Sequence, residues 1–393
     1  MELTNDPASM ADPFPEYDRL RAAGPVYRAS TPTGEEVWVV TRYADARPVL
    51  ADPRFAFDKA NSTSGYRGFA LPPALDANLL NMDDPGHARV RRLVSAAFTV
   101  RRVQRLQPTI EAVVAGLIDA VAPAGKADLI ADLALPLPLT LIGELLGVPA
   151  GDRAAFRAWT SDLIAPPSRA AAQSAVVDME HLLRSLIAAK RSAPADDLIS
   201  AMIAARDDRD QLTEDELTSL AFLVLWAGYE VTVDLLGAGI LALLDHPDQL
   251  DLLRADPEAA AGAVDELLRW TAPSPYAIRR FPREDVTVGG VRIPVGATVL
   301  VSLASAHRDP AQFPDPGVLD LRRANAATHL GFGFGAHYCL GAPLARLEVA
   351  AALRAVAVRL PELRLDVPAD ALRWRPSFRA RGLLALPVTF RPA

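Results

Sequence analysis

The chain has 393 residues, half of them hydrophobic, so it can bury a large core. It carries 41 basic and 48 acidic residues, a net charge of −7, which argues against a nucleic-acid-binding protein because such proteins gather basic residues on one face. The single cysteine, Cys339, excludes an intramolecular disulfide and a zinc site built on several thiolates. Residues 1–10 show no secretory signal and no apolar run reaches about eighteen residues, so we expect a cytoplasmic protein outside the membrane.

Strand-like patterns lie toward the two ends of the chain and helical patterns lie between them. Strands are expected at 37–41, 286–288, 298–302 and 383–390. We therefore expect a mainly α-helical protein with a small β region, formed as one domain over residues 1–393. Its β-rich part should cover about 25–60, 275–305 and 363–390, and its helical body about 85–270 and 342–360.

The most informative predicted helix begins near Thr213, which has capping-box spacing to Glu216, and ends before Pro247. About 32 residues at 1.5 Å each make a rod near 50 Å long, and its apolar circumference indicates burial. In the middle of the helix, Gly228 and Glu230 interrupt the apolar pattern. They indicate either a packing glycine beside a carboxylate that reaches the surface, or a functional break, and the residues alone leave both open.

The segment 332–341, FGFGAHYCLG, carries the strongest chemical signal. Its glycines allow tight turns and close approach to a bulky group, and Cys339 stands just before a predicted helix at 342–360, whose N-terminus favours a thiolate. The thiolate could be a nucleophile with His337 as its base, or a metal ligand. A ligand to haem iron fits better, because the loop is apolar and leaves room beside the sulfur.

This loop resembles the haem-binding motif of the cytochrome P450 family, Phe-Gly-x-Gly-x-His-x-Cys-x-Gly, at every fixed position. The resemblance extends over about residues 12–388 and is closest to soluble bacterial members that tailor natural products. It implies a triangular helical prism with haem b between the long central helix and the helix after Cys339. It also implies that the Cys339 thiolate binds the iron and that Phe332, His337 and Gly341 lie against the haem.

Other segments resemble the family in the same order along the chain. Glu266 and Arg269 match its Glu-x-x-Arg pair, which joins two side chains on one helix face. The remaining cofactor contacts implied by the resemblance are His87, Arg91 and Arg280 toward the haem propionates and Ala227 on the central helix. Arg279 is the neighbouring candidate to Arg280, and strand alternation lets only one of the two face inward.

The central helix departs from the family at one position. Members usually read Ala-Gly-x-Glu/Asp-Thr-Thr, and the acid and first alcohol are associated with proton delivery. Here Glu230 retains the acid, but Val231 stands at the alcohol position and cannot form a hydrogen bond. Thr232 lies about 100° further round the helix. Protons could instead come through water and a substrate hydroxyl, the enzyme could couple phenols or indoles without inserting oxygen, or it could use peroxide.

The resemblance therefore implies a monooxygenase that hydroxylates or epoxidises a hydrophobic, medium-sized natural product. The alternatives from other classes are a non-catalytic haem-binding sensor or carrier, and a hydrolase that uses Cys339 and a histidine. The chain has no recognisable NAD(P)H or flavin motif, so its electrons should come from a ferredoxin or flavodoxin and its reductase. Docking contacts could include Arg101, Arg102, Arg105 and Arg346.

Substrate contacts are expected from apolar segments that would lie over the distal face of the haem, including residues 68–81 and 163–168. The side chains expected to contribute are Leu79, Leu80, Leu163, Tyr229, Tyr276, Ile278 and Phe378.

Overall fold

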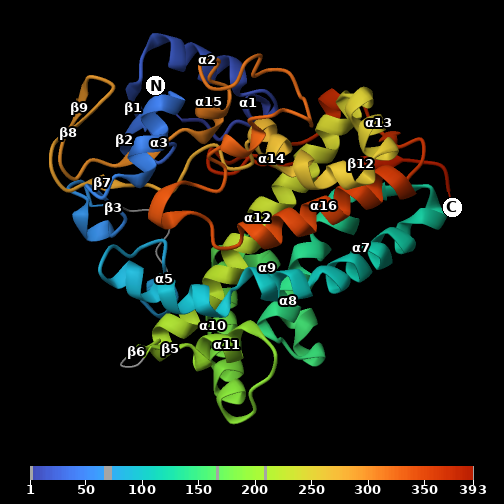
Figure 1. Ribbon diagram of the computed structural model, residues 1–393, viewed down its shortest axis with the longest axis horizontal. Helices are drawn as coiled ribbons and strands as arrows, with labels where there is room; N and C mark the ends of the chain where they lie inside the picture. The colour runs from blue at the N-terminus through green and yellow to red at the C-terminus, as the bar shows by residue number, and fades with distance from the viewer. Residues whose placement is uncertain (1–2, 66–72, 165–167, 208–209, 393) are drawn as a thin grey trace. The chain divides into compact units, whose positions relative to one another are not determined.

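The computed structural model of the protein describes residues 3–65, 73–164, 168–207 and 210–392 (Figure 1). Of the expected substrate segments, residues 68–72 and 165–167 lie outside this description. Contacts divide the chain into two compact units, the first built from 1–66, 110–135 and 231–393 and the second from 67–109 and 136–230. The long helix α12, Glu214–Asp245, contributes to both units.

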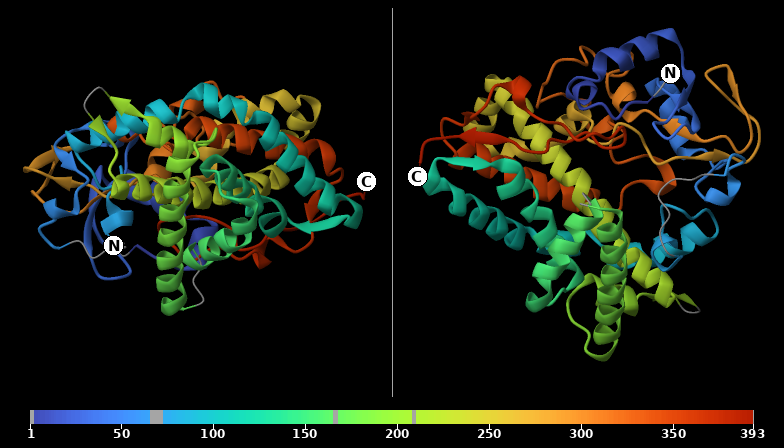
Figure 2. Two further views of the ribbon diagram at one scale, coloured as in Figure 1. Left: turned by 90° about the horizontal axis from the view of Figure 1, so that it is seen from below. Right: turned by 180° about the vertical axis from the view of Figure 1, so that it is seen from behind.

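The first unit holds the β structure and the helices that follow the central helix. Its helices are α1 (Pro7–Ala11), α2 (Phe14–Ala23), α3 (Tyr43–Ala51), α13 (Pro247–Ala255), α14 (Ala260–Thr271), α15 (Leu303–His307) and α16 (Ala342–Arg359), together with most of α7 (Gln107–Val121). The start of α16 agrees with the helix expected from residue 342. Helix α2 packs on α15, and α14 packs on α16 (Figures 1 and 2).

Three strands form the main sheet of this unit, in the order β1 (Val26–Ser30), β2 (Glu36–Val40) and β10 (Val299–Val301). Strand β2 pairs antiparallel with β1 and parallel with β10, so two segments about 260 residues apart in the chain share a ladder. A second sheet has the order β11 (Arg364–Leu365), β12 (Pro387–Thr389) and β4 (Lys126–Asp128). The shorter pairs are β3 (Phe55–Ala56) with β7 (Phe281–Pro282), and β8 (Val286–Val288) with β9 (Val291–Ile293).

The sequence predictions of strands are confirmed for β2, β8 and β10 and only partly for the C-terminal strand. The expected strand at 383–390 shortens to β12, and Leu383 forms only an isolated bridge with Trp374. Strand β4 interrupts the region expected to be helical. It has three residues, too few to show an alternating pattern, and it exists because β12 pairs with it from the far end of the chain.

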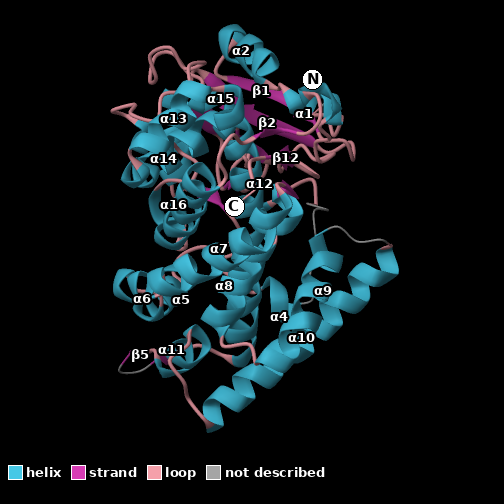
Figure 3. Ribbon diagram, turned by 90° about the vertical axis from the view of Figure 1, so that its right-hand side faces the viewer, coloured by secondary structure: helices cyan, strands magenta, loops and turns pink. Residues whose placement is uncertain are grey.

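The second unit is mainly helical. Its helices are α4 (Pro73–Asp76), α5 (Gly86–Ala97), α6 (Val100–Arg105), α8 (Pro136–Leu146), α9 (Arg153–Ile164), α10 (Arg169–Ser192) and α11 (Leu198–Ala204), with the first part of α12. Strands β5 (Arg206–Asp207) and β6 (Asp210–Gln211) form a short hairpin before α12. Helices α9 and α10 run side by side, as Figure 3 shows.

The predicted capping box starts α12. The backbone N–H of Thr213 donates to Glu216 Oε2 at 2.9 Å, and the N–H of Glu216 donates to Thr213 Oγ1 at 3.2 Å. Further along, a Cβ on Gly228 would lie 3.3 Å from Ile142 Cδ1 of α8, so this glycine lets the two helices approach closely. Among the described residues, α12 is the one single helix that is long and apolar enough to span a bilayer, and the bent pair 86–105 and 107–124 passes the same test only if it is taken as one span. Of the most apolar window of α12, 61% is buried, as in a core helix.

Candidate active site

The loop before α16 holds Cys339 on a tightly turned backbone. Gly333 and Gly335 have φ values of +75° and +81°, a region that side chains disfavour. A Cβ on Gly335 would also lie 2.9 Å from the Cα of Ala51. The N–H of Cys339 donates to the carbonyl of Phe332 at 2.8 Å, which closes the loop, and Cys339 itself is exposed. The loop therefore leaves Cys339 accessible just before the N-terminus of α16.

A buried arginine lies in the same unit without an anionic partner among the described residues. Arg280 is 3% exposed, and its one hydrogen bond there is from Nη1 to the carbonyl of Ile278 at 2.9 Å. Burial, together with the neighbouring charge of Arg279, lowers the pKa of Arg280 to about 9. A guanidinium in this state fits a carboxylate group supplied by a bound molecule, which is what a haem propionate would provide.

Aromatic stacking connects Arg280 with the cysteine loop. The guanidinium lies 4.8 Å from the centre of the Phe57 ring, and the His337 ring stacks on Phe57 at 3.6 Å between centroids. Sequence reasoning missed Phe57, because a lone phenylalanine after a short strand has no distinctive spacing. The stack brings the predicted residues His337 and Arg280 to one place in the first unit.

In the second unit, α5 places His87 and Arg91 on one helix face. His87 is 3% exposed, and burial lowers its pKa, an effect that Asp84 partly opposes. Arg91 is half-buried. The helix expected around these two residues is present, and both side chains remain candidates for contact with a negatively charged group.

The residues in the middle of α12 differ in their exposure. Ala227 is exposed although buried residues precede and follow it, while Glu230 and Val231 are half-buried. Thr232 is only 6% exposed. Val231 and Thr232 thus differ in their surroundings, as the 100° turn between consecutive helical residues requires.

Glu266 and Arg269 form a fully buried ion pair on α14. The Arg269 Nε and Nη2 atoms donate to the two carboxylate oxygens of Glu266, each at 2.7 Å. Arg323 adds a bond from Nε to Glu266 Oε1 at 3.1 Å. Arg269 Nη1 also donates to the carbonyls of His307 and Pro316, so the pair joins α14 to the segment that leads to the cysteine loop.

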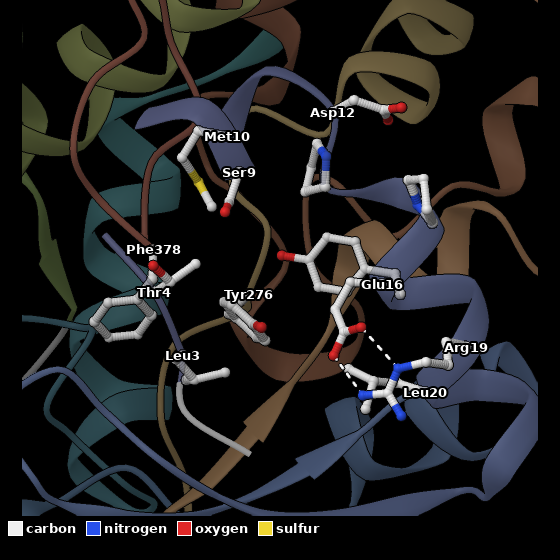
Figure 4. A pocket seen from close by; sticks show the side chains of 13 residues that line it. Leu3, Thr4, Ser9, Met10, Asp12, Glu16, Arg19, Leu20, Tyr276 and Phe378 are labelled. Carbon is white, nitrogen blue, oxygen red and sulfur yellow. Dashed lines mark hydrogen bonds and ion pairs between the residues drawn. The ribbon is translucent and has the colours of Figure 1, made fainter. Parts of the chain in front are cut away.

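The expected substrate residues are placed in both units. In the second, Leu79, Leu163 and Tyr229 are buried and Leu80 is half-buried. In the first, the rings of Tyr276 and Phe378 lie 6.1 Å apart and line a cleft of about 450 Å³ (Figure 4). The other residues that line this cleft come from the N-terminal segment: Leu3, Thr4, Ser9, Met10, Asp12, Pro13, Pro15, Glu16, Tyr17, Arg19 and Leu20.

Three of the four arginines expected to dock an electron donor already have partners within their own units. Arg102 and Arg105 lie 3.2 Å and 3.9 Å from carboxylate oxygens of Asp196. Arg346 is bound to Asp265 at 2.8 Å. Arg101 is exposed. Sequence reasoning missed Asp265, because a single acid beside the Glu266 pair does not stand out from other helical acids.

Comparison with known proteins identifies the family. The family model described as "Cytochrome P450" matches residues 259–359. The cytochrome P450 monooxygenase PikC of Streptomyces venezuelae is 50% identical over 384 residues, which cover 97% of this chain and 92% of PikC. The 6-deoxyerythronolide B hydroxylase of Saccharopolyspora erythraea is 42% identical, with 96% of each chain covered. The chain belongs to the cytochrome P450 family.

Solved structures agree with this assignment. The ligand-free P450 monooxygenase TamI has a TM-score of 0.91 at 42% identity, covering 99% of this chain and 93% of TamI. The P450 PksS of Bacillus subtilis also has a TM-score of 0.91, at 36% identity with 98% of each chain covered. The protein has the P450 fold and is a haem-thiolate monooxygenase that takes electrons from redox partners and acts on small molecules.

Proposed function

We propose that this P450 hydroxylates or epoxidises a hydrophobic, medium-sized natural product such as a macrolide or a related polyketide. One structural observation carries the site assignment: a buried guanidinium at Arg280 stacks through Phe57 toward the loop that presents Cys339. The substrate class rests on the relatives, which include the mycinamicin IV hydroxylase/epoxidase of Micromonospora griseorubida, 42% identical over 95% of this chain.

Cys339 is the ligand to the haem iron in this proposal, since the chain has no other cysteine. Arg280 would bind a propionate, with His337, His87 and Arg91 as further donors. The bound haem supplies the activation of O2 with two external electrons. The protein orients the haem and the substrate, excludes water, and controls the protons.

This chain differs from the usual family pattern in its route for proton delivery. Glu230 supplies the acid on α12, but Val231 cannot pass a proton on, and Thr232 is buried on another side of the helix. We propose that ordered water and a hydroxyl of the substrate complete the route from Glu230. Oxidative coupling of aryl groups remains a distinct reaction class for the same site and would release no oxygenated product.

The substrate would contact Tyr276 and Phe378, whose rings form an apolar wall with Ile278 nearby on the same segment. The second unit would contribute Leu79, Leu80, Leu163 and Tyr229. We infer a ferredoxin or flavodoxin as the electron donor, reduced by its own reductase, and a cytoplasmic location. One domain over residues 1–393 would carry all of these functions.

The first test is the optical spectrum of the reduced protein under carbon monoxide. We expect the Soret band of thiolate-ligated haem for the native chain and its loss in Cys339→His, because imidazole is a neutral ligand that donates less electron density. Tyr338→Phe, beside the ligand, is the matched control and should keep the native band. A native chain that binds no haem, or a Cys339→His variant with the thiolate band, would overturn the proposal.

A second prediction concerns Val231. Macrolide aglycones, 6-deoxyerythronolide B among them, would first be screened by the spin-state shift they cause on binding. For a compound that is turned over, Val231→Thr should change the product formed per electron by less than about twofold, or about 0.4 kcal/mol in barrier, because the proton route bypasses this position. Glu230→Gln, the control, should raise peroxide release. A severalfold gain in product from Val231→Thr would show that the missing alcohol limits catalysis.

A further inference from the structure

The cysteine loop is flanked by a first stem before it, which includes His329, and a second stem after it, which includes Arg346. Both stems contact one carboxylate of α14. His329 stands before the loop, and its Nε2 lies 3.0 Å from Asp265 Oδ1. Arg346 stands after Cys339, on α16, and its Nε and Nη2 lie 2.9 Å and 2.8 Å from the same oxygen. Asp265 therefore contacts the chain on both sides of the iron ligand.

The proton positions on His329 follow from its contacts. Its Nδ1 accepts the backbone N–H of Gly331 at 2.9 Å, so Nε2 carries the hydrogen that Asp265 accepts. The His329 side chain is 2% exposed, which leaves it little freedom to turn. The neighbouring residue Leu330 donates its N–H to His307 Nε2 at 2.9 Å. Two imidazoles thus fix two consecutive backbone groups of the first stem.

The second stem fixes Phe332, the first residue of the haem-binding motif. The Arg346 guanidinium lies 4.5 Å from the centre of the Phe332 ring, and its Nη1 lies 3.5 Å from the hydroxyl of Tyr338. The His329 ring packs on Phe332 at 5.5 Å between centroids. Because the Phe332 carbonyl accepts the N–H of Cys339, a shift of Phe332 would move the ligand.

Helix α14 packs against the first stem and is itself held by a buried ion pair. A Cβ on Gly331 would lie 2.7 Å from Leu268 Cγ, so the first stem lies directly on the helix. Glu266, next to Asp265, holds the buried ion pair with Arg269. Burial opposes ionisation of Asp265, but the hydrogen bond from His329 and the charge of Arg346 outweigh it and lower its pKa. The carboxylate is therefore charged and held on both sides.

We propose that Asp265 is a positioning residue for the haem-thiolate bond: through His329 and Arg346 it fixes Phe332 and so keeps Cys339 in place as an ionised ligand. This inference rests on the proposed role of Cys339. It assigns to Asp265 and His329 a function in retention of the thiolate ligand, separate from the global stability of the fold. Arg346 thereby has an internal role in addition to any contact with an electron donor.

The test follows the ferrous–carbon monoxide complex of the haem-loaded protein in mild urea. The measured rate is that at which the thiolate-type Soret band changes into the band of a neutral or protonated ligand. Asp265→Asn should raise this rate about tenfold, as expected for loss of charge from a charge-assisted bond. Asp119→Asn is the matched control, since Asp119 pairs with Arg359 at the other end of α16, and it should leave the rate unchanged.

A variant that truncates a core side chain of the same helix distinguishes the proposed role of Asp265 from a purely structural one. Val264→Ala truncates a fully buried side chain beside Asp265, and urea unfolding followed by circular dichroism gives the stability of each variant. At equal loss of global stability, Asp265→Asn should convert much faster than Val264→Ala. Equal rates for the two would overturn the inference, whereas absence of the thiolate band in the native protein would overturn the proposed function itself.

If Asp265→Asn takes up no haem, Arg346→Gln decides, because its side chain is 30% exposed and tolerates replacement better. This change removes the guanidinium from Phe332 and from Asp265. Faster conversion of the band in Arg346→Gln would support the inference, and a native rate would contradict it.

Discussion

Replacement of Glu266 by glutamine is expected to abolish haem incorporation and to destabilise the protein by about 3–5 kcal/mol, the usual cost of leaving a buried charge without its partner. Glu266 and Arg269 are both 0% exposed, and Arg323 is nearly so at 9%. Glutamine would leave two guanidinium groups without a carboxylate. Its amide nitrogen would also meet N–H donors where an oxygen now accepts them.

The loss would be large relative to the whole stability of a domain, which is about 5–15 kcal/mol. Glu266 Oε1 also accepts the backbone N–H of Asp320 at 3.1 Å, so the change would loosen the segment that precedes the cysteine loop. Haem content and urea unfolding followed by circular dichroism are the measurements. Because the variant takes up no haem, its free energy of unfolding is compared with that of the native apo-protein.

Glu16→Gln provides the control. Glu16 pairs with Arg19 at 2.6 Å at the same i,i+3 spacing, but the two side chains are 50% and 64% exposed. Water screens such a pair, so its loss should cost less than about 1 kcal/mol. A cost for Glu266→Gln in that same small range would show that the buried pair does not anchor the fold.

The sequence predicted the parts of this protein that depend on local patterns. The capping box at Thr213 and Glu216 fixes the start of α12, and the helix after Cys339 begins at Ala342 as expected. The fold class followed from the resemblance of the loop 332–341 to the P450 motif. These features depend on residues that are close in sequence, and the backbone forms them nearly independently of the rest of the chain.

Features that depend on distant segments could not be predicted in this way. Strand β4 exists because β12 pairs with it, and Phe57 reaches His337 across about 280 residues of sequence. Asp265 has the same spacing to its neighbours as any helical acid, and only the fold brings His329 and Arg346 to it. For the substrate contacts, the sequence predicts apolar side chains but does not show which segments lie beside them. In the structure, Phe378 lines a cleft together with the N-terminal segment.

The second large effect is expected at Glu348, a carboxylic acid buried in α16. Its residue is 2% exposed, and no hydrogen bond or ion pair to its carboxylate is found among the described residues. Burial raises the pKa of Glu348 to about 8, so the side chain is neutral in the folded protein at pH 7. In the unfolded chain the same group is ionised at that pH.

This difference makes stability depend on pH with a definite sign. Between the unfolded pKa of 4.5 and the folded pKa of about 8, the folded state binds more protons, so stability is greatest at the acid end and falls as pH rises. The slope is about 1.4 kcal/mol per pH unit, which amounts to about 5 kcal/mol across the window. Above pH 8 the contribution of this group no longer changes.

Glu348→Gln should remove this slope, because glutamine has nearly the shape of the protonated acid and does not titrate. The measurement is the free energy of unfolding of the native chain and the variant from pH 5 to 8.5, of which only the difference is used, since other groups titrate in the same range. As pH rises toward 8, the free energy of unfolding of the variant should increase relative to that of the native chain by several kcal/mol.

Glu362→Gln is the matched control for this change. Glu362 follows α16, its side chain is 62% exposed, and it pairs with Arg391 at 3.4 Å, so its removal should leave the pH dependence as it is. A constant difference between Glu348→Gln and the native chain across the whole range would mean that the acid is ionised in the folded protein. Glu348 would then need a compensating cation or water beside it in the protein core, because the free-energy cost of burying an isolated carboxylate is too high.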